Sequence, residues 1–126
     1  LGISKKITWI HWIDQDKLVD TYGDYGIFLF PSLHDSGGLV CLEAMASGLP
    51  IVCLNIGGPG RLIEESFGIS VNPYEKGIRK IIKNLSLAIL HYSSSLSEWE
   101  NASKNAFEKS KEHSWANLVK NFDVYK

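Results

Sequence analysis

The sequence predicts an α/β fold in which helices cover both faces of a parallel sheet. Two short runs, residues 27–30 and 51–54, are apolar at every position, and segments of helical periodicity alternate with such runs along the chain. A strand that is apolar on both faces is typical of a parallel sheet, and alternating strands and helices imply right-handed crossovers. The 126 residues suit a single Rossmann-like domain.

The first expected elements are a strand, a short helix and a second strand. Residues 7–13 are β-branched and aromatic, which predicts a strand. Asp14 or Asp16 can cap a short helix, which Gly23 closes. The apolar run at 27–30 then predicts a buried strand, because a proline follows it directly.

The middle of the chain predicts a helix, two more strands and a loop. A polar turn leads into a helix over residues 39–47, which Gly48 is placed to end. Residues 51–54 predict the next buried strand. The glycine-rich loop at 57–60 opens a helical turn, and residues 69–71 predict the last strand.

Further helices are expected after the last strand. The first of them places five apolar side chains on one face, namely Ile78, Ile81, Ile82, Leu85 and Ile89. Ser97 with Glu100 has the spacing of a capping box, which predicts the start of the next helix. Ser114 can cap a final helix that packs three apolar side chains, Trp115, Val119 and Phe122.

The overall composition argues against several classes of function. Lys and Arg number 13 against 14 Asp and Glu, a net charge of −1, whereas a nucleic-acid-binding domain normally carries a basic stripe. Cys41 and Cys53 lie inside apolar runs, so we expect reduced, buried thiols rather than a disulfide or a metal site. No stretch reaches the roughly 18 apolar residues of a membrane span. We expect a cytoplasmic protein that needs no metal or other cofactor.

The loop after residues 27–30 combines groups that suit a sugar nucleotide. In an open α/β sheet, ligands bind beyond the carboxyl ends of the strands. Gly37 and Gly38 let a ligand approach the backbone closely, and the N-terminus of the following helix favours a phosphate. Asp35 and Glu43 flank the same spot, and carboxylates accept hydrogen bonds from paired hydroxyls. A ligand with both phosphates and hydroxyls therefore fits this segment.

Each of these signals also has an ordinary structural explanation. Asp35 could bond its own turn, and Glu43 could be a solvated helix residue. The neighbours of Glu43 are almost wholly apolar, however, so its charge needs a partner. Arg61 and His34 are expected to be a surface residue and a loop residue without a role in catalysis.

A longer motif runs from Phe28 to Gly58. It reads Phe-Leu-Phe-Pro-Ser, an acid, seven residues, Glu-Ala-Met-Ala, then Gly-x-Pro and Gly-Gly. This motif resembles the signature of glycosyltransferase family 4, and the similarity extends over nearly the whole chain. The resemblance implies a retaining, metal-independent enzyme of the GT-B fold. Residues 1–126 would then form part of its C-terminal, donor-binding domain.

The resemblance also implies roles for individual residues. Glu43 would hold the ribose hydroxyls of the nucleotide, and Asp35 would contact the transferred sugar as the catalytic residue. The other donor-binding positions would be the loop and helix-start residues Ser36, Gly37, Gly38 and Leu39, near the diphosphate and sugar, and His11 and Ile13, near the nucleobase.

Some positions depart from the family pattern. The first acid is Asp35 where glutamate is usual, and residues 36–38 read Ser-Gly-Gly where Gly-Phe-Gly is common. His11 stands in place of a frequent glycine, and Gly60 follows Pro59 where the family usually has glutamate. The basic pair that neutralises the donor pyrophosphate in the family, and its acceptor-binding N-terminal domain, would both lie upstream of residue 1.

The resulting functional hypothesis is transfer of a sugar from a nucleotide-diphosphate donor to an acceptor hydroxyl, with retention of anomeric configuration. The acceptor would be a glycan or a lipid-linked glycan, so the complete enzyme could associate peripherally with the inner face of the membrane. One alternative is a sugar-nucleotide epimerase or phosphorylase of the same fold. Another is a non-catalytic nucleotide-binding fragment, and the isolated chain is expected to be inactive.

Overall fold

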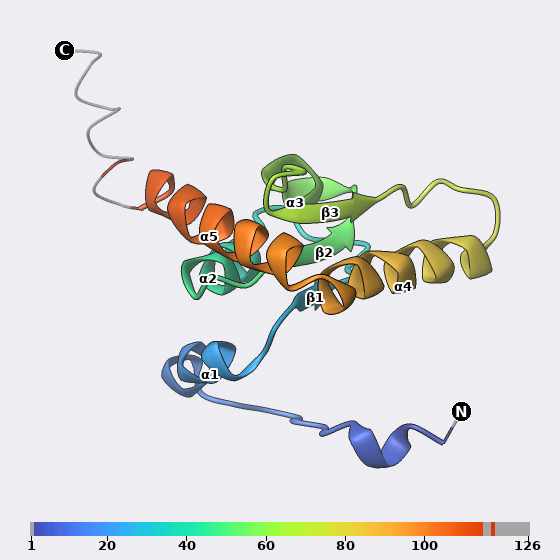
Figure 1. Ribbon diagram of the computed structural model, residues 1–126, viewed down its shortest axis with the longest axis horizontal. Coiled ribbons are helices and arrows are strands. Elements are labelled where there is room, and N and C mark those ends of the chain that lie inside the picture. The colour runs from blue at the N-terminus through green and yellow to red at the C-terminus, as the bar shows by residue number, and fades with distance from the viewer. Residues whose placement is uncertain (1, 115–116, 118–126) are drawn as a thin grey trace.

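A computed structural model of the chain describes residues 2–114 and residue 117, and it has the predicted α/β architecture (Figure 1). The strands are β1 (Phe28–Phe30), β2 (Ile51–Leu54) and β3 (Gly68–Val71). The α-helices are α1 (Gln15–Thr21), α2 (Leu39–Ala46), α3 (Gly57–Leu62), α4 (Ile78–Ser94) and α5 (Leu96–Glu112). Single 3-10 turns cover Ser4–Lys6 and Tyr22–Asp24.

The strands of the described residues form one sheet in the order β1-β2-β3, and their parallel pairing is as the sequence predicts. Ile51 of β2 is aligned with Phe28 of β1 on one side and with Gly68 of β3 on the other. Every residue of β2 is buried, which explains why its sequence is apolar without alternation. Because all the strands run the same way, the loops that follow β1 and β2 emerge at the same end of the sheet.

The central strand divides the core between the two faces of the sheet. Ile51 and Cys53 belong to a cluster built with side chains of α2, including Met45. Val52, which points to the other face, packs with Ala88 and others of α4 and α5. Helix α5 contributes side chains to both clusters. It packs against both α2 and α4 (Figure 1).

The predicted strand at residues 7–13 is wrong. This stretch is extended but pairs with no strand, and Figure 1 shows it running apart from the sheet toward α1. Trp9 and Trp12 keep 75% and 78% of their surface exposed. β-Branched and aromatic residues favour a strand only where a neighbouring strand or face receives them, and none of the described strands lies beside this segment.

The start of α5 also differs from the prediction. Ser95, rather than Ser97, is the cap: its hydroxyl accepts the backbone N–H of Glu98 at 3.4 Å, so the helix begins two residues earlier. Ser95 and Glu98 have the same Ser-x-x-Glu spacing as the expected pair, so two overlapping signals compete. Helix α3 likewise begins at Gly57, inside the expected loop. The side chains of the predicted final helix, Trp115, Val119 and Phe122, lie outside the described residues.

Gly48 and the cysteines follow the sequence-based expectations. Gly48, just after α2, has a φ of 75°, the left-handed conformation that ends a helix. Cys41 and Cys53 are free thiols and fully buried. None of the described helices has both the length and the hydropathy needed to span a membrane.

Candidate functional site

The loop between β1 and α2 is organised by the carboxylate of Asp35. One oxygen of Asp35 accepts the backbone N–H groups of Gly37, at 3.0 Å, and Gly38. Gly38 then adopts a left-handed conformation, with a φ of 68°, and α2 begins at the next residue. Asp35 therefore forms the turn that the sequence left open as an alternative, and this turn leads into α2, whose N-cap is Gly38.

A second glycine-rich loop, which follows β2, packs directly on this one. The N–H of Gly58 donates to the carbonyl oxygen of Asp35 at 2.9 Å. A Cβ atom on Gly58 would lie 2.6 Å from the Ser36 carbonyl oxygen and 2.7 Å from the Gly37 carbonyl carbon. Gly57, with a φ of 62°, has the backbone of Asp35 where its Cβ would be. The glycine pair is thus required by contact between two backbones.

The backbone N–H groups predicted to bind a phosphate already make hydrogen bonds within the loop. The N–H groups of Gly37 and Gly38 are bonded to Asp35, so a ligand oxygen at these amides would have to share or displace that carboxylate. Ser36 and Leu39 lie beside them and are exposed, Leu39 with 70% of its surface. The structure brings all of these residues into one loop and helix start. Their contacts with a donor stay predictions.

Glu43 lies in the second turn of α2 and is half-buried. Its Oε1 atom accepts a hydrogen bond of 3.0 Å from the side-chain amide of Gln15, the first residue of α1. Tyr22, just after α1, is close enough to the same carboxylate for the charge of Glu43 to affect the pKa of its hydroxyl. Burial raises the pKa of the Tyr22 hydroxyl, and the negative charge of Glu43 raises it further. Glu43 therefore has the partner that its apolar surroundings require.

His11 and Ile13 lie in the extended segment before α1. Ile13 lines an apolar cavity of about 320 Å³ with Tyr22, Phe28 and other residues of α1 and β1, whereas His11 is exposed and does not line it. Ile13 is thus half-buried at the cavity, whereas His11 stays at the surface. Neither residue contacts the Asp35 loop through a hydrogen bond among those that the described residues form.

Gln15 and Tyr22 are the site residues that sequence reasoning missed as functional candidates. A tyrosine within an otherwise apolar helix face usually needs a partner for its hydroxyl, and that requirement was the available signal for Tyr22. Nothing in the spacing of Gln15 identifies it. Its contact with Glu43 spans 28 residues of sequence and depends on how α1 sits against α2.

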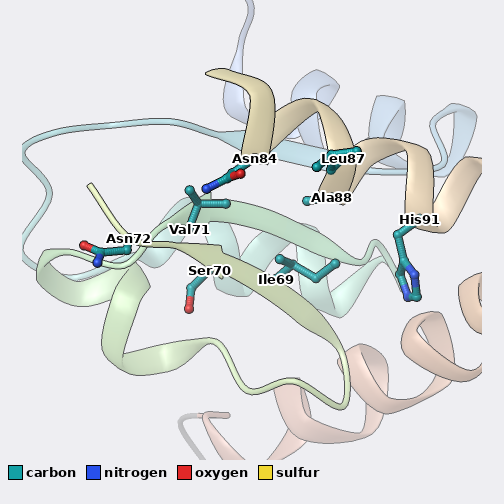
Figure 2. Close-up of a pocket in the computed structure, with 8 residues that line it drawn as sticks. All are labelled: Ile69, Ser70, Val71, Asn72, Asn84, Leu87, Ala88 and His91. Atoms are coloured by element: carbon teal, nitrogen blue, oxygen red, sulfur yellow. The ribbon is translucent and has the colours of Figure 1, made fainter. Parts of the chain in front are cut away.

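A more open cavity lies on the far side of the sheet, between β3 and α4. Figure 2 shows its lining side chains, with Asn72 and Asn84 toward one end and His91 at the other. The cavity measures about 410 Å³ and is lined mainly by apolar groups of Ile69, Val71 and Leu87. None of the predicted site residues lines it.

The remaining polar residues near the loops have structural contacts. Arg61 donates from Nε to the carbonyl oxygen of Gly57 at 3.2 Å, within its own helix. The backbone N–H of His34 meets the Ser32 hydroxyl at 3.3 Å, and the His34 side chain is exposed. Burial raises the pKa of the Cys41 thiol to about 12, which leaves it protonated and unsuited to nucleophilic attack.

Known glycosyltransferases resemble the chain along most of its length. It is 32% identical to an uncharacterized glycosyltransferase of Methanocaldococcus jannaschii over 100% of the chain and 32% of that protein. It is 32% identical to a sucrose synthase of Melioribacter roseus, over 90% of the chain and 15% of the relative. A shorter match, 40% identical over 48% of the chain, covers 13% of a D-inositol 3-phosphate glycosyltransferase of Rhodococcus jostii.

A solved structure agrees with the fold. The sucrose-phosphate synthase of Thermosynechococcus elongatus superposes with a TM-score of 0.81 at 25% identity, over 98% of this chain and 30% of that one. The chain therefore spans about a third or less of the proteins that it matches. The family described as "Glycosyl transferases group 1" matches residues 1–108. With this match, and with the parallel sheet and glycine-rich loops of that region, the chain belongs to the group 1 glycosyltransferase family.

Proposed function

We propose that the complete protein transfers a sugar from a nucleotide-diphosphate sugar to an acceptor hydroxyl, with retention, and that this chain supplies much of the donor site. In this proposal residues 1–126 are part of the C-terminal, donor-binding domain of a GT-B enzyme. The observation that carries the proposal is the position of Glu43. It is a half-buried carboxylate on α2, directly behind a glycine-rich loop at the carboxyl end of a parallel strand.

Glu43 is proposed to hold the ribose hydroxyls of the nucleotide. An ionised carboxylate accepts hydrogen bonds at two oxygens and can receive a pair of neighbouring hydroxyls. Gln15 bonds only Oε1 of Glu43, so acceptor capacity remains on this carboxylate. The family membership of the chain supports this role, and its relatives include a sucrose synthase and D-inositol 3-phosphate glycosyltransferases.

Asp35 is proposed to have two roles. Its carboxylate forms the turn before α2, and only one of its oxygens is engaged by Gly37 and Gly38. The other oxygen is proposed to contact a hydroxyl of the transferred sugar and so to fix the anomeric carbon for reaction. Ser36 and Leu39 would complete this wall of the donor site, and Ile13 and His11 would border the base.

The proposed reaction is electrostatic rather than covalent. The bond between the anomeric carbon and the diphosphate oxygen breaks, and the acceptor oxygen bonds to that carbon from the same face. The acceptor proton passes to the departing phosphate oxygen. Backbone N–H groups at the start of α2, together with cations from outside this chain, would stabilise the departing charge. No metal or cofactor is invoked. The acceptor is proposed to be a glycan or lipid-linked glycan at the cytoplasmic face of the membrane.

Two alternative functions use the same fold. A sugar-nucleotide epimerase or phosphorylase would also bind a diphosphate here, and a non-catalytic chain would bind a nucleotide without turnover. The Glu-Ala-Met-Ala-Ser-Gly-Leu-Pro run that begins at Glu43 favours a transferase, as does the family match.

The test is calorimetric titration of the complete protein with UDP and with GDP, followed by a screen of the corresponding sugar donors. Glu43→Ala should weaken binding of the preferred nucleotide by about 1.5–3 kcal/mol, the contribution of a hydrogen bond to a charged group. Glu98→Ala, which removes an exposed carboxylate on α5, is the matched control and should leave affinity unchanged. Equal affinities for wild type and Glu43→Ala would remove Glu43 from the site and overturn the proposal.

A further inference from the structure

Tyr22 brings a buried hydroxyl into the neighbourhood of Glu43. Its side chain is only 3% exposed and belongs to the main core cluster with Met45 and Leu49. The ring is packed edge-on against Phe28, with centroids 5.8 Å apart. Within the described part of the chain, the hydroxyl is buried and has no hydrogen-bond partner. An unpaired buried hydroxyl costs free energy, so it needs an explanation.

The candidate hydrogen-bond acceptor for this hydroxyl is the Glu43 carboxylate. Burial, the charge of Glu43 and a side-chain contact of hydrogen-bonding type with its carboxylate raise the pKa of the Tyr22 hydroxyl. The hydroxyl nevertheless makes no hydrogen bond of full geometry. The same carboxylate already accepts the Gln15 amide at 3.0 Å. Two donors therefore face one acceptor: an exposed amide from the start of α1 and a buried hydroxyl from the turn after it.

The Tyr22 hydroxyl and the Gln15 amide differ in rigidity, so they can act on the Glu43 carboxylate in different ways. Tyr22 is fixed by the core and cannot follow the carboxylate, whereas Gln15 is exposed and can adjust. A carboxylate offers about four lone-pair sites. It can therefore accept both protein donors and still bind ligand hydroxyls.

We propose that Gln15 and Tyr22 are positioning residues for Glu43, which orient its carboxylate toward the hydroxyls of a bound nucleotide. The inference rests on the proposed function, in which Glu43 contacts the ribose. Gln15 holds one oxygen in the free protein. When the nucleotide binds, the Tyr22 O–H donates a hydrogen bond to Glu43, because a small rotation of the carboxylate then brings the two groups into bonding geometry.

The unpaired state of the Tyr22 hydroxyl separates this role from a structural one. In the free protein, Tyr22→Phe removes no hydrogen bond of full geometry, only the weaker contact with Glu43, and keeps the ring in its packing. The melting temperature of the variant should therefore equal or exceed that of wild type. A loss of nucleotide affinity in a protein of unchanged stability would point to the hydroxyl itself.

The experiment is a double-mutant cycle on the complete protein, with UDP and GDP as probes in calorimetry. Tyr22→Phe and Gln15→Ala are each expected to raise the Kd of the nucleotide that wild type binds by about tenfold, as for other hydrogen bonds to a charged group. In the Glu43→Ala background, neither substitution should have a further effect. Matched controls are Tyr25→Phe, an exposed tyrosine of the same turn, and Lys17→Ala, an exposed residue of α1. Both should leave Kd unchanged.

Turnover supplies a second readout once a donor is known. A positioning role through Glu43 predicts that Tyr22→Phe raises the KM for the donor while kcat stays within about twofold, since the lost contact serves binding. A purely structural role would instead lower the melting temperature and reduce the active fraction.

The outcomes separate the inference from the function beneath it. If Glu43→Ala leaves nucleotide affinity unchanged, the proposed function fails, and the inference fails with it. If Glu43→Ala weakens binding but Tyr22→Phe and Gln15→Ala do not, only the inference is overturned. It is also overturned if either substitution weakens binding equally in the presence and absence of Glu43, because the effect would then not pass through that carboxylate.

Discussion

The backbone N–H of Gly58 donates to the carbonyl oxygen of Asp35 at 2.9 Å, and this bond fastens the loop after β2 to the loop after β1. The two residues are neighbours only because β1 and β2 are adjacent and parallel. The contact is close enough to exclude any side chain at Gly58. The shape of the candidate site thus depends on a loop that carries none of its predicted binding residues.

The first prediction concerns this close approach. Gly58→Ala should lower the free energy of unfolding by about 1–3 kcal/mol, because its Cβ would overlap the backbone of residues 36 and 37. Gly23→Ala is the control, since a Cβ there meets nothing within 4 Å. Denaturant unfolding of both variants measures the difference. A Gly58→Ala variant as stable as Gly23→Ala would show that the loops separate easily.

The second prediction separates the two roles of Asp35. Asp35→Asn keeps an oxygen that can accept the N–H groups of Gly37 and Gly38, whereas Asp35→Ala removes it. Asp35→Ala should therefore cost about 1 kcal/mol of stability, as for other hydrogen bonds within proteins, and Asp35→Asn much less. Both should lose most sugar transfer if the negative charge acts on the donor. Full activity in Asp35→Asn would leave this residue with its structural role alone.

The third prediction concerns thiol reactivity. Burial raises the pKa of Cys41 to about 12 and that of Cys53 to about 11. A disulfide reagent should therefore label neither thiol in the native protein at about pH 8, near the ordinary thiol pKa, and should label both after denaturation. Rapid labelling of the native protein would mean that the core opens locally.

The same thiols predict how stability varies with alkaline pH. Their pKa values are higher in the folded state, so above about pH 9 the unfolded chain releases thiol protons that the native protein keeps. The stabilisation is complete below the unfolded pKa and is lost as the pH rises toward about 11 for Cys53 and about 12 for Cys41. Unfolding measured across this range should show a smaller decline in a Cys41→Ala variant than in wild type.

The fifth prediction tests the cap of α5. Ser95→Ala removes the acceptor of the Glu98 N–H and should lower the free energy of unfolding by about 1 kcal/mol. Ser97→Ala, at the position that sequence reasoning favoured, should have a smaller effect because its hydroxyl only meets that of Ser95. The reverse order in chemical unfolding would restore Ser97 as the cap.

The sequence was sufficient where local pattern and long-range packing coincide. The apolar runs placed β1 and β2 correctly, and a left-handed glycine marked the end of α2. Burial on both faces holds only for the central strand β2, however. The expectation that β1 is a buried strand is wrong, because no described strand covers its outer edge and Leu29 stays 44% exposed. The segment at residues 7–13 carries a similar sequence signal without a strand beside it. Its composition favours a β-strand, but a strand forms only where a neighbouring strand is available to pair with it.

The candidate site could be predicted only in part for a similar reason. Asp35 and Glu43 stood out because they lie in one short motif near glycines. The contact between Gln15 and Glu43 joins residues 28 positions apart, and the buried hydroxyl of Tyr22 is visible only once α1 is placed against α2. Neither leaves a periodic signal in the chain.

The alternation along β2 has a consequence for how the sheet assembles. Ile51 and Cys53 face one core cluster and Val52 faces the other, so sliding β2 by one residue would exchange the two sets between clusters of different shape. The same slip would carry the following loop about 3.3 Å along the strand axis, beyond the reach of the Gly58 N–H to Asp35. Core packing therefore favours the correct strand alignment, and a misaligned sheet would lose the junction between its two glycine-rich loops.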